Sequence, residues 1–326
     1  MSIKISKLES REYSKAEFDK KGDIIKAPRS SYLKLKLSGN DITEELINSI
    51  RRTILQFIPT YAFTKELIDI TTNTTNLNND QIKLRISQMP IFDISNDIDH
   101  LDHKYWNIDY SKEYDKHKKD NKKIELFIKA KNAKNEIMNI TSDEAEFYVN
   151  DKQVKYKKTD PLLIAQLSPK SELVCHAKAA MGIGFKNDIW SSGQCHFYEE
   201  DDGFVMVIRS YGQFTEKDML KKACAYLKEN CLNIEKQIKQ SMFPENKNNY
   251  IITLENEDFT CACIINYYIQ NNDVVKSSGV VRENHNIDSI TFKIELESSS
   301  ISKVFSKAIN DVLAIYKKFE DAIAKI

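Results

Sequence analysis

The chain has 326 residues, 41% of them hydrophobic, which suffices for two or three domains with apolar cores. Its 48 basic and 48 acidic residues cancel, which argues against a protein that grips nucleic acid over a broad basic face. The six cysteines form no C-x-x-C pair and indicate a reducing compartment. We expect no signal peptide and no membrane span, because no apolar run approaches the roughly 18 residues that a span needs.

The first elements follow a polar segment, 1–30, which is expected to be a tail or a loose strand. Alternating apolar and polar residues predict a strand at 32–37. A helix is predicted at 42–58, with Asp41 as its cap and Glu44 completing a capping box. Its apolar face holds Leu46, Ile47, Ile50, Ile54, Phe57 and Ile58. Arg51 lies at the edge of that face and Arg52 on the far side, as on a solvated helix flank.

The middle of the chain reads mainly as strands, with one long interruption. The segment 93–123 is rich in Asp, Lys, His and Tyr without periodicity, which is typical of a polar loop or insertion. Strands are predicted at 66–72, 82–86, 124–129, 146–156, 172–179 and 204–208.

The last part repeats the order of elements. An amphipathic helix is predicted at 216–240, with Met219, Leu220, Ala223, Leu227, Ile234 and Ile238 on its apolar side. After a linker at 241–249, the pattern predicts a strand at 250–254, a helix at 260–270 and strands at 279–282 and 290–296. A long helix from about 300 carries Ile301, Val304, Phe305, Ala308, Val312, Ile315, Phe319 and Ile323 on one side.

Strand, capped short helix, strands and long helix therefore occur twice, and the first copy carries a large insertion. Each long helix needs an apolar partner that its own small sheet cannot supply. Two copies in one chain can cover each other through an intramolecular, pseudo-two-fold contact. The fold class expected is α+β, an intramolecular pseudo-dimer of two modules.

Three motifs in order resemble the α-type assembly subunits of multisubunit DNA-dependent RNA polymerases. The first is Asn48-Ser49-Ile50-Arg51-Arg52 with the later Pro59. The second is the run from Thr72 to Ile91, and the third is Leu163–Leu167 with Gly182-Ile183-Gly184, both similar to the eukaryotic and archaeal branch. The run Glu255–Thr260 resembles the lead-in of the family's small partner subunit. A chain carrying both partners is similar to the fused subunit of large nucleocytoplasmic DNA viruses.

The resemblance implies a first dimerisation module at 1–64 with 198–245, an inserted mainly-β domain at 65–197 and a second module at 246–326. It implies a non-catalytic platform for transcription, on which the two large catalytic subunits and other small subunits assemble, with little direct nucleic-acid contact and no membrane. Asn48, Arg51 and Arg52 would be partner-binding residues, since arginine holds acceptors bidentately. The location implied is intracellular, in the cytoplasm of an infected cell or the virion if the chain is viral, otherwise the nucleus.

The sequence departs from the family at two places in the second copy. Cys261-Ala262-Cys263 stands in place of the usual Leu-Gly-Asn, and Asn266 replaces the usual Arg. The family's eukaryotic branch often holds zinc in a cysteine cluster of the inserted domain, and this sequence has no such cluster. We therefore expect no metal, no cofactor and no catalytic residue.

Two other hypotheses remain. One is a metal-dependent enzyme that uses the 93–123 segment, where His100, His103 and His117 lie among aspartates. The other is a stand-alone dimeric binding module. For the histidines, a polar loop is favoured over a metal site.

Overall fold

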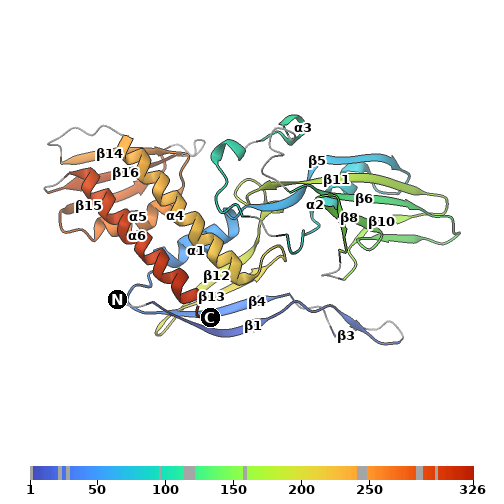
Figure 1. Ribbon diagram of the computed structural model, residues 1–326, viewed down its shortest axis with the longest axis horizontal. Helices are drawn as coiled ribbons and strands as arrows, with labels where there is room; N and C mark the ends of the chain where they lie inside the picture. Colours follow the sequence, from blue (N-terminus) through green and yellow to red (C-terminus); the bar gives the residue numbers. More distant parts are fainter. Residues whose placement is uncertain are drawn as a thin grey trace.

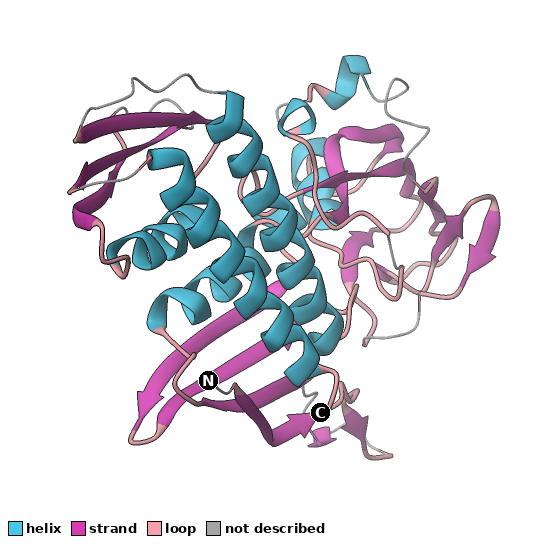
Figure 2. Ribbon diagram, turned by 60° about the vertical axis from the view of Figure 1, so that its left-hand side comes forward, coloured by secondary structure: helices cyan, strands magenta, loops and turns pink. Residues whose placement is uncertain are grey.

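A computed structural model describes residues 3–20, 24–26, 30–94, 97–106, 108–113, 122–156, 160–240, 248–283, 289–297 and 300–326. The fold is α+β, as expected (Figure 1). Four helices lie together between two small sheets, and a larger sheet forms a lobe beside them (Figures 1 and 2). In the described residues no helix is long and apolar enough to cross a bilayer. We call 3–240 the first half and 248–326 the second half.

The first half contributes a four-stranded antiparallel sheet. Its strands, in spatial order, are β1 (Lys4–Arg11), β4 (Tyr32–Ser38), β13 (Gly203–Ser210) and β12 (Gly193–Glu200). The alternation predicted for β4 is confirmed, because Leu33, Leu35 and Leu37 are all buried. The amino-terminal segment is a paired strand, β1, rather than a tail, and β12 was not predicted. A small hairpin of β2 (Glu17–Phe18) and β3 (Ile24–Lys26) follows β1.

The short helix α1 (Glu44–Gln56) begins two residues later than predicted. Its cap is Thr43, whose Oγ1 accepts a hydrogen bond from the Leu46 N–H at 3.3 Å. The prediction of Asp41 as the cap was wrong; Asp41 lies outside the helix and pairs with Lys318 at 3.1 Å. All six residues predicted for the apolar face are buried.

The lobe is built on a five-stranded sheet in the order β5 (Thr60–Asn73), β11 (Glu172–Gly182), β6 (Ile124–Lys131), β8 (Ala145–Val149) and β9 (Lys152–Val154). A pair, β7 (Met138–Thr141) and β10 (Leu163–Leu167), adjoins it. The strand predicted at 82–86 is wrong: α2 (Asn79–Ser87) is a helix. Asn78 and Gln81 form its reciprocal capping box.

The described part of 93–123 is mostly irregular, as expected of a loop, and Asp102, Lys104 and Asp109 are exposed, but other side chains of the segment are packed. It contains a 3-10 turn, η1 (His103–Tyr105), and a short helix, α3 (Tyr110–Glu113). Leu101 is buried, and Lys222 of the long helix pairs with Asp99 at 2.9 Å. A second 3-10 turn, η3 (Asp188–Trp190), lies near the end of the lobe.

The second half repeats the strand order of the first. The long helix α4 (Glu216–Gln240) closes the first half, and the second consists of β14 (Asn249–Glu255), α5 (Phe259–Gln270), β15 (Val275–Val281), β16 (Ser289–Leu296) and α6 (Ile301–Ile323). Its sheet has the order β14-β16-β15, which matches β4-β13-β12. In both, the strand before the short helix pairs with the strand before the long helix.

The core lies where the helices of the two halves meet. The long helices α4 and α6 pack against each other, and the short helices α1 and α5 contact them and one another (Figure 2). Every residue predicted for the apolar faces of α4 and α6 is buried. The predicted amphipathicity of both helices is therefore confirmed, and each covers the other's apolar side.

Candidate functional site

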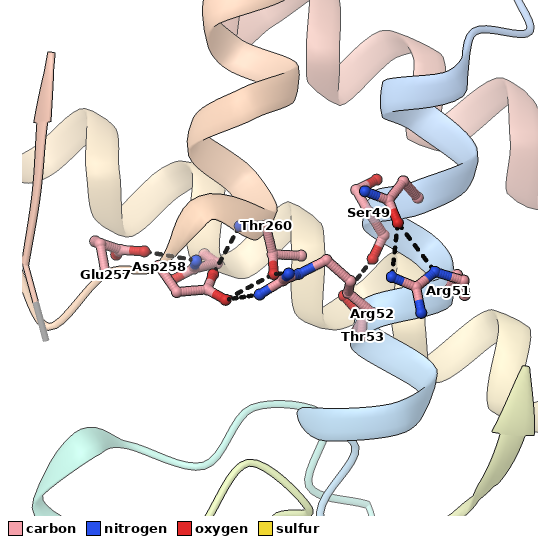
Figure 3. A network of polar contacts seen from close by, with 9 residues as sticks. Ser49, Arg51, Arg52, Thr53, Glu257, Asp258 and Thr260 are labelled. Carbon is pink, nitrogen blue, oxygen red and sulfur yellow. Dashed lines mark hydrogen bonds and ion pairs between the residues drawn. The ribbon is translucent and has the colours of Figure 1, made fainter. Parts of the chain in front are cut away.

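Arg52 ties the first half to the second. Its Nη2 pairs with Asp258 Oδ2 at 2.9 Å, and its Nε donates to Thr260 Oγ1 at 2.9 Å (Figure 3). Asp258 also caps α5, since its Oδ1 accepts the Thr260 N–H at 2.8 Å. Its carboxylate therefore neutralises a guanidinium and a helix amino terminus at once. The Asp258 side chain is only 11% exposed.

Asn48 and Arg51 form a separate pair on α1. The Nε and Nη2 of Arg51 donate to Asn48 Oδ1 at 2.9 and 2.8 Å (Figure 3). The two residues are about one helical turn apart, so their side chains meet on the helix surface. Burial lowers the pKa of the Arg51 guanidinium from its ordinary value. These two bonds use two of its five N–H groups. The three residues predicted from the sequence thus divide: Asn48 and Arg51 are brought together, and Arg52 points to the other half.

A second polar contact joins α1 to α6. Ser49 and Tyr316 hydroxyls lie 2.9 Å apart, and both residues are buried. Ser49 Oγ lies 2.7 Å from the Leu46 carbonyl, and Thr53 Oγ1 donates to the Ser49 carbonyl at 2.8 Å. The hydroxyls of α1 therefore remain hydrogen-bonded inside an otherwise apolar interface, as buried polar groups require.

Glu257 is a buried carboxyl that the sequence analysis missed. It is 4% exposed, and Asn230 Nδ2 of α4 donates to its Oε2 at 2.9 Å. Burial raises the pKa of Glu257 to about 8, while the bond from Asn230 opposes the rise. In the described residues Asn230 Oδ1 is buried without a hydrogen-bond partner, and a protonated carboxyl is a donor that suits it. In the sequence Glu257 looked like one more acidic residue before a helix cap.

A groove of about 530 Å³ runs between α1 and α5. Its wall on α1 carries Glu45, Asn48 and Arg52, and its wall on α5 carries Cys263 and Asn266. Cys263 and Asn266, where the sequence departs from the family pattern, therefore line this groove. Cys261 and Ala262, which also depart from it, are buried.

His100 and His103 of the 93–123 segment lie against aromatic rings, His100 stacked and His103 tilted. His100 lies 5.1 Å from the Tyr226 ring and His103 lies 4.0 Å from Trp106, centre to centre. Burial lowers the pKa of His100 below its usual value. Nowhere in the described ranges do three His, Cys, Asp or Glu side chains gather as metal ligands. His117 lies outside the described residues.

Comparison with known proteins agrees with this architecture. The family model described as the RNA polymerase Rpb3/Rpb11 dimerisation domain matches residues 35–231, well over half of the chain. The chain is also 24% identical over 340 aligned residues to a putative DNA-directed RNA polymerase subunit of Acanthamoeba polyphaga mimivirus, covering 95% of each protein. The matched residues include all of α1 and the part of α4 up to Cys231, and these two helices carry the first half's side of the junction. The chain belongs to the family of the RNA polymerase Rpb3/Rpb11 dimerisation domain.

Proposed function

We propose that this non-catalytic polymerase subunit is an assembly platform on which the two large catalytic subunits of a DNA-dependent RNA polymerase dock. The observation that carries the proposal is the junction itself, where the short helices α1 and α5 are locked together by Arg52, Asp258 and Thr260. A platform must hold its docking elements rigidly, because mobile elements lose ordering entropy on binding. The catalytic chemistry then belongs to the partners.

The two halves act, in this proposal, as an intramolecular pseudo-dimer. The first module comprises 1–64 with 198–245, the inserted domain 65–197, and the second module 246–326. The equal strand orders β4-β13-β12 and β14-β16-β15 support this division. So does the mutual covering of α4 and α6. Joining both modules in one chain raises the effective concentration of one for the other, to roughly the millimolar range for a short linker.

We assign docking of a large subunit to the α1 face that holds Asn48, Arg51 and Arg52. Among the hydrogen bonds of the described residues, Arg51 uses only its Nε and Nη2, both toward Asn48 at the groove, and this amide orients its guanidinium. Arg52 is 30% exposed, so its outer edge remains available while Asp258 holds the rest. Oriented arginines suit carboxylates or backbone carbonyls of a partner.

The mimivirus relative supports a viral origin and a role in an infected cell or virion.

The proposed platform is tested by affinity purification of the tagged, full-length chain from its native source. Two very large chains should co-purify in equal amounts with it and support templated RNA synthesis, whereas the isolated chain should not. Recovery of the chain alone, or with partners unrelated to a polymerase, would contradict the proposal.

A further inference from the structure

The groove between α1 and α5 is lined by equivalent turns of the two helices. The caps are Thr43 on α1 and Asp258 on α5. Counted from its own cap, each helix lines the groove with its first, second, fifth and ninth residues, which are Glu44, Glu45, Asn48 and Arg52 on α1 and Phe259, Thr260, Cys263 and Tyr267 on α5. The walls therefore correspond in position but not in chemistry, because among the described lining residues all the charged ones lie on α1.

The charge that remains in the groove is negative. Arg52 is the base among its lining residues, and Asp258 neutralises that guanidinium at 2.9 Å. Glu44 is exposed and Glu45 half-buried, and no ion pair within the described residues involves either carboxylate. Both glutamates also lie in the first turn of α1, where a carboxylate favours the helix dipole. The dipole explains acids at this position but not the cavity that they line.

The opposite wall is hollow and partly aromatic. Cys263 and Asn266 are short side chains on this wall, and the half-buried rings of Phe259 and Tyr267 line the same groove. Arg282, which is not among the lining residues, lies over Phe259 at 5.8 Å from the ring centre, so that ring already accepts a guanidinium. The groove therefore offers carboxylates on one wall and a tyrosine ring on the other.

We infer that an arginine of the docking large subunit enters this groove and brings its guanidinium to Glu44, Glu45 and the Tyr267 ring. Tryptophan, tyrosine and arginine are the side chains that most often anchor interfaces in pockets. Of these three, arginine complements carboxylates that lack a cation, and its planar guanidinium also stacks on aromatic rings. The inference rests on the proposed function and names the partner's chemistry at the α1 face.

Cys263 is a native reporter of the groove. All six cysteines lie in the described residues, and the other five are buried. N-ethylmaleimide applied to the native full-length chain should therefore label Cys263 alone. In the purified polymerase complex, the labelling rate should fall about tenfold or more, because a side chain in the groove excludes the reagent.

The labelling separates this inference from the proposed function. Unchanged labelling of Cys263 in a complex that contains both large subunits would overturn the inference alone. Purified material without the large subunits would contradict the proposed function, and the inference with it.

The glutamates are tested by removing their charge. Glu44→Gln and Glu45→Gln, combined in the full-length chain, keep the size of both side chains. Recovery of the large subunits should weaken about tenfold, and the difference from the parent should shrink at high salt. Glu66→Gln, at an exposed position of β5, is the matched control and should assemble like the parent. Melting of the free chain reports any effect on the α1 dipole separately. Equal recovery of the double variant would overturn the inference.

The occupant is identified by chemistry specific for arginine. Phenylglyoxal modifies arginine, and one arginine of a large subunit should be protected in the parent complex relative to the free subunit. Alanine at that arginine should restore the labelling of Cys263 in the complex. If labelling stays slow, another group covers the groove and the inference is overturned. A carbodiimide-formed link from Glu44 or Glu45 to a partner lysine would also overturn it, because lysine would then be the occupant.

Discussion

Arg52 carries a positive charge from α1 to the amino terminus of α5, where Asp258 is 11% exposed. Replacing it with alanine leaves that carboxylate without its strongest donor in a poorly hydrated place. We expect Arg52→Ala to lower the free energy of unfolding by roughly 1–3 kcal/mol, the range for truncating a charge-assisted hydrogen bond. Chemical denaturation monitored by circular dichroism measures the change.

The control for Arg52 is Lys239, whose pair with Glu235 lies on the surface of α4 and leaves the lysine 62% exposed. Lys239→Ala should change stability by less than about 0.5 kcal/mol. A double-mutant cycle combines Arg52→Ala with Asp258→Asn, which keeps the helix cap and removes the charge. The coupling energy between the two substitutions should differ from zero. Zero coupling would mean that the two side chains act independently.

Glu257 makes stability depend on pH. Its pKa is about 8 in the folded protein against an ordinary value of 4.5, so between these pH values the folded state holds a proton that the unfolded state releases. The contribution of Glu257 to the free energy of unfolding is therefore largest below its pKa in the unfolded chain, and it falls as pH rises from 4.5 to about 8. Glu257→Gln keeps an acceptor for Asn230 and removes this slope. The variant should match the parent near pH 4.5 and exceed it near pH 8 by an amount on the order of a few kcal/mol. Equal stability curves would refute the buried acid.

At this scale the sequence located the arginines but not their partners. Nothing local links Arg52 to Asp258, since 206 positions separate them and only the packing of α1 on α5 brings them together. Glu257 was missed for a related reason. Its burial depends on Asn230 of α4, whereas its sequence neighbours suggested a solvated acidic turn.

At the scale of elements, α2 shows how two periodicities compete. Ile82, Leu84 and Ile86 alternate with charged residues, which predicts a strand. Ile82 and Ile86 are also one helical turn apart, and both are buried while Leu84 is 45% exposed. A strand would have buried all three on one face. The decisive signal was the Asn78–Gln81 capping box, which precedes the apolar positions.

The cap of α2 is testable by itself. Asn78→Ala removes the acceptor for the Gln81 N–H, which lies 2.8 Å from Asn78 Oδ1. Loss of such a cap costs about 1 kcal/mol, so amide exchange in α2 should quicken about fivefold where it proceeds by local opening. Lys83→Ala, in the middle of the same helix, serves as the control and should leave exchange within twofold or slow it. Unchanged exchange in Asn78→Ala would show that packing alone holds α2.

The long helices were predictable because their apolar faces are long and regular. All fourteen residues named for α4 and α6 in the sequence analysis are buried. Strands β12 and β1 were harder to predict, since both lie at the outer edges of their sheet. The residues of β1 are mostly exposed, and β12 alternates in burial only as far as Tyr198. An edge strand is hydrogen-bonded to a single neighbouring strand, and a local sequence pattern does not show that pairing.

At the scale of the assembly, a substitution of Arg51 tests the proposed docking role separately from folding. Arg51→Ala removes a guanidinium that contacts only its own helix neighbour Asn48 among the hydrogen bonds found in the described residues. Stability should shift by about 0.5 kcal/mol or less. Docking to the large subunit should weaken at least tenfold, since loss of one buried charged contact costs roughly 2–5 kcal/mol. A pull-down with matched melting curves measures both; equal assembly would mean that Arg51 is a solvated flank.

We expect the whole molecule to be stable only if each half covers the other. The buried face of α4 includes Leu227 and Ile234, both at 0% exposure, and α4 packs on α6, so a fragment of residues 1–245 would expose apolar surface of α4 to water. A contiguous apolar surface of this kind drives association, so we expect the fragment alone to be poorly soluble. Residues 246–326, supplied as a separate chain, should restore a soluble one-to-one complex.

Two leucines of α4 provide the matched comparison. Leu227→Glu in the first fragment should abolish rescue because the charge would be buried, whereas Leu232→Glu should permit it because Leu232 is 44% exposed. Size-exclusion chromatography with light scattering distinguishes the outcomes. A monodisperse monomer of 1–245 would mean that α4 is covered within its own half and that the junction is an addition to a domain already complete.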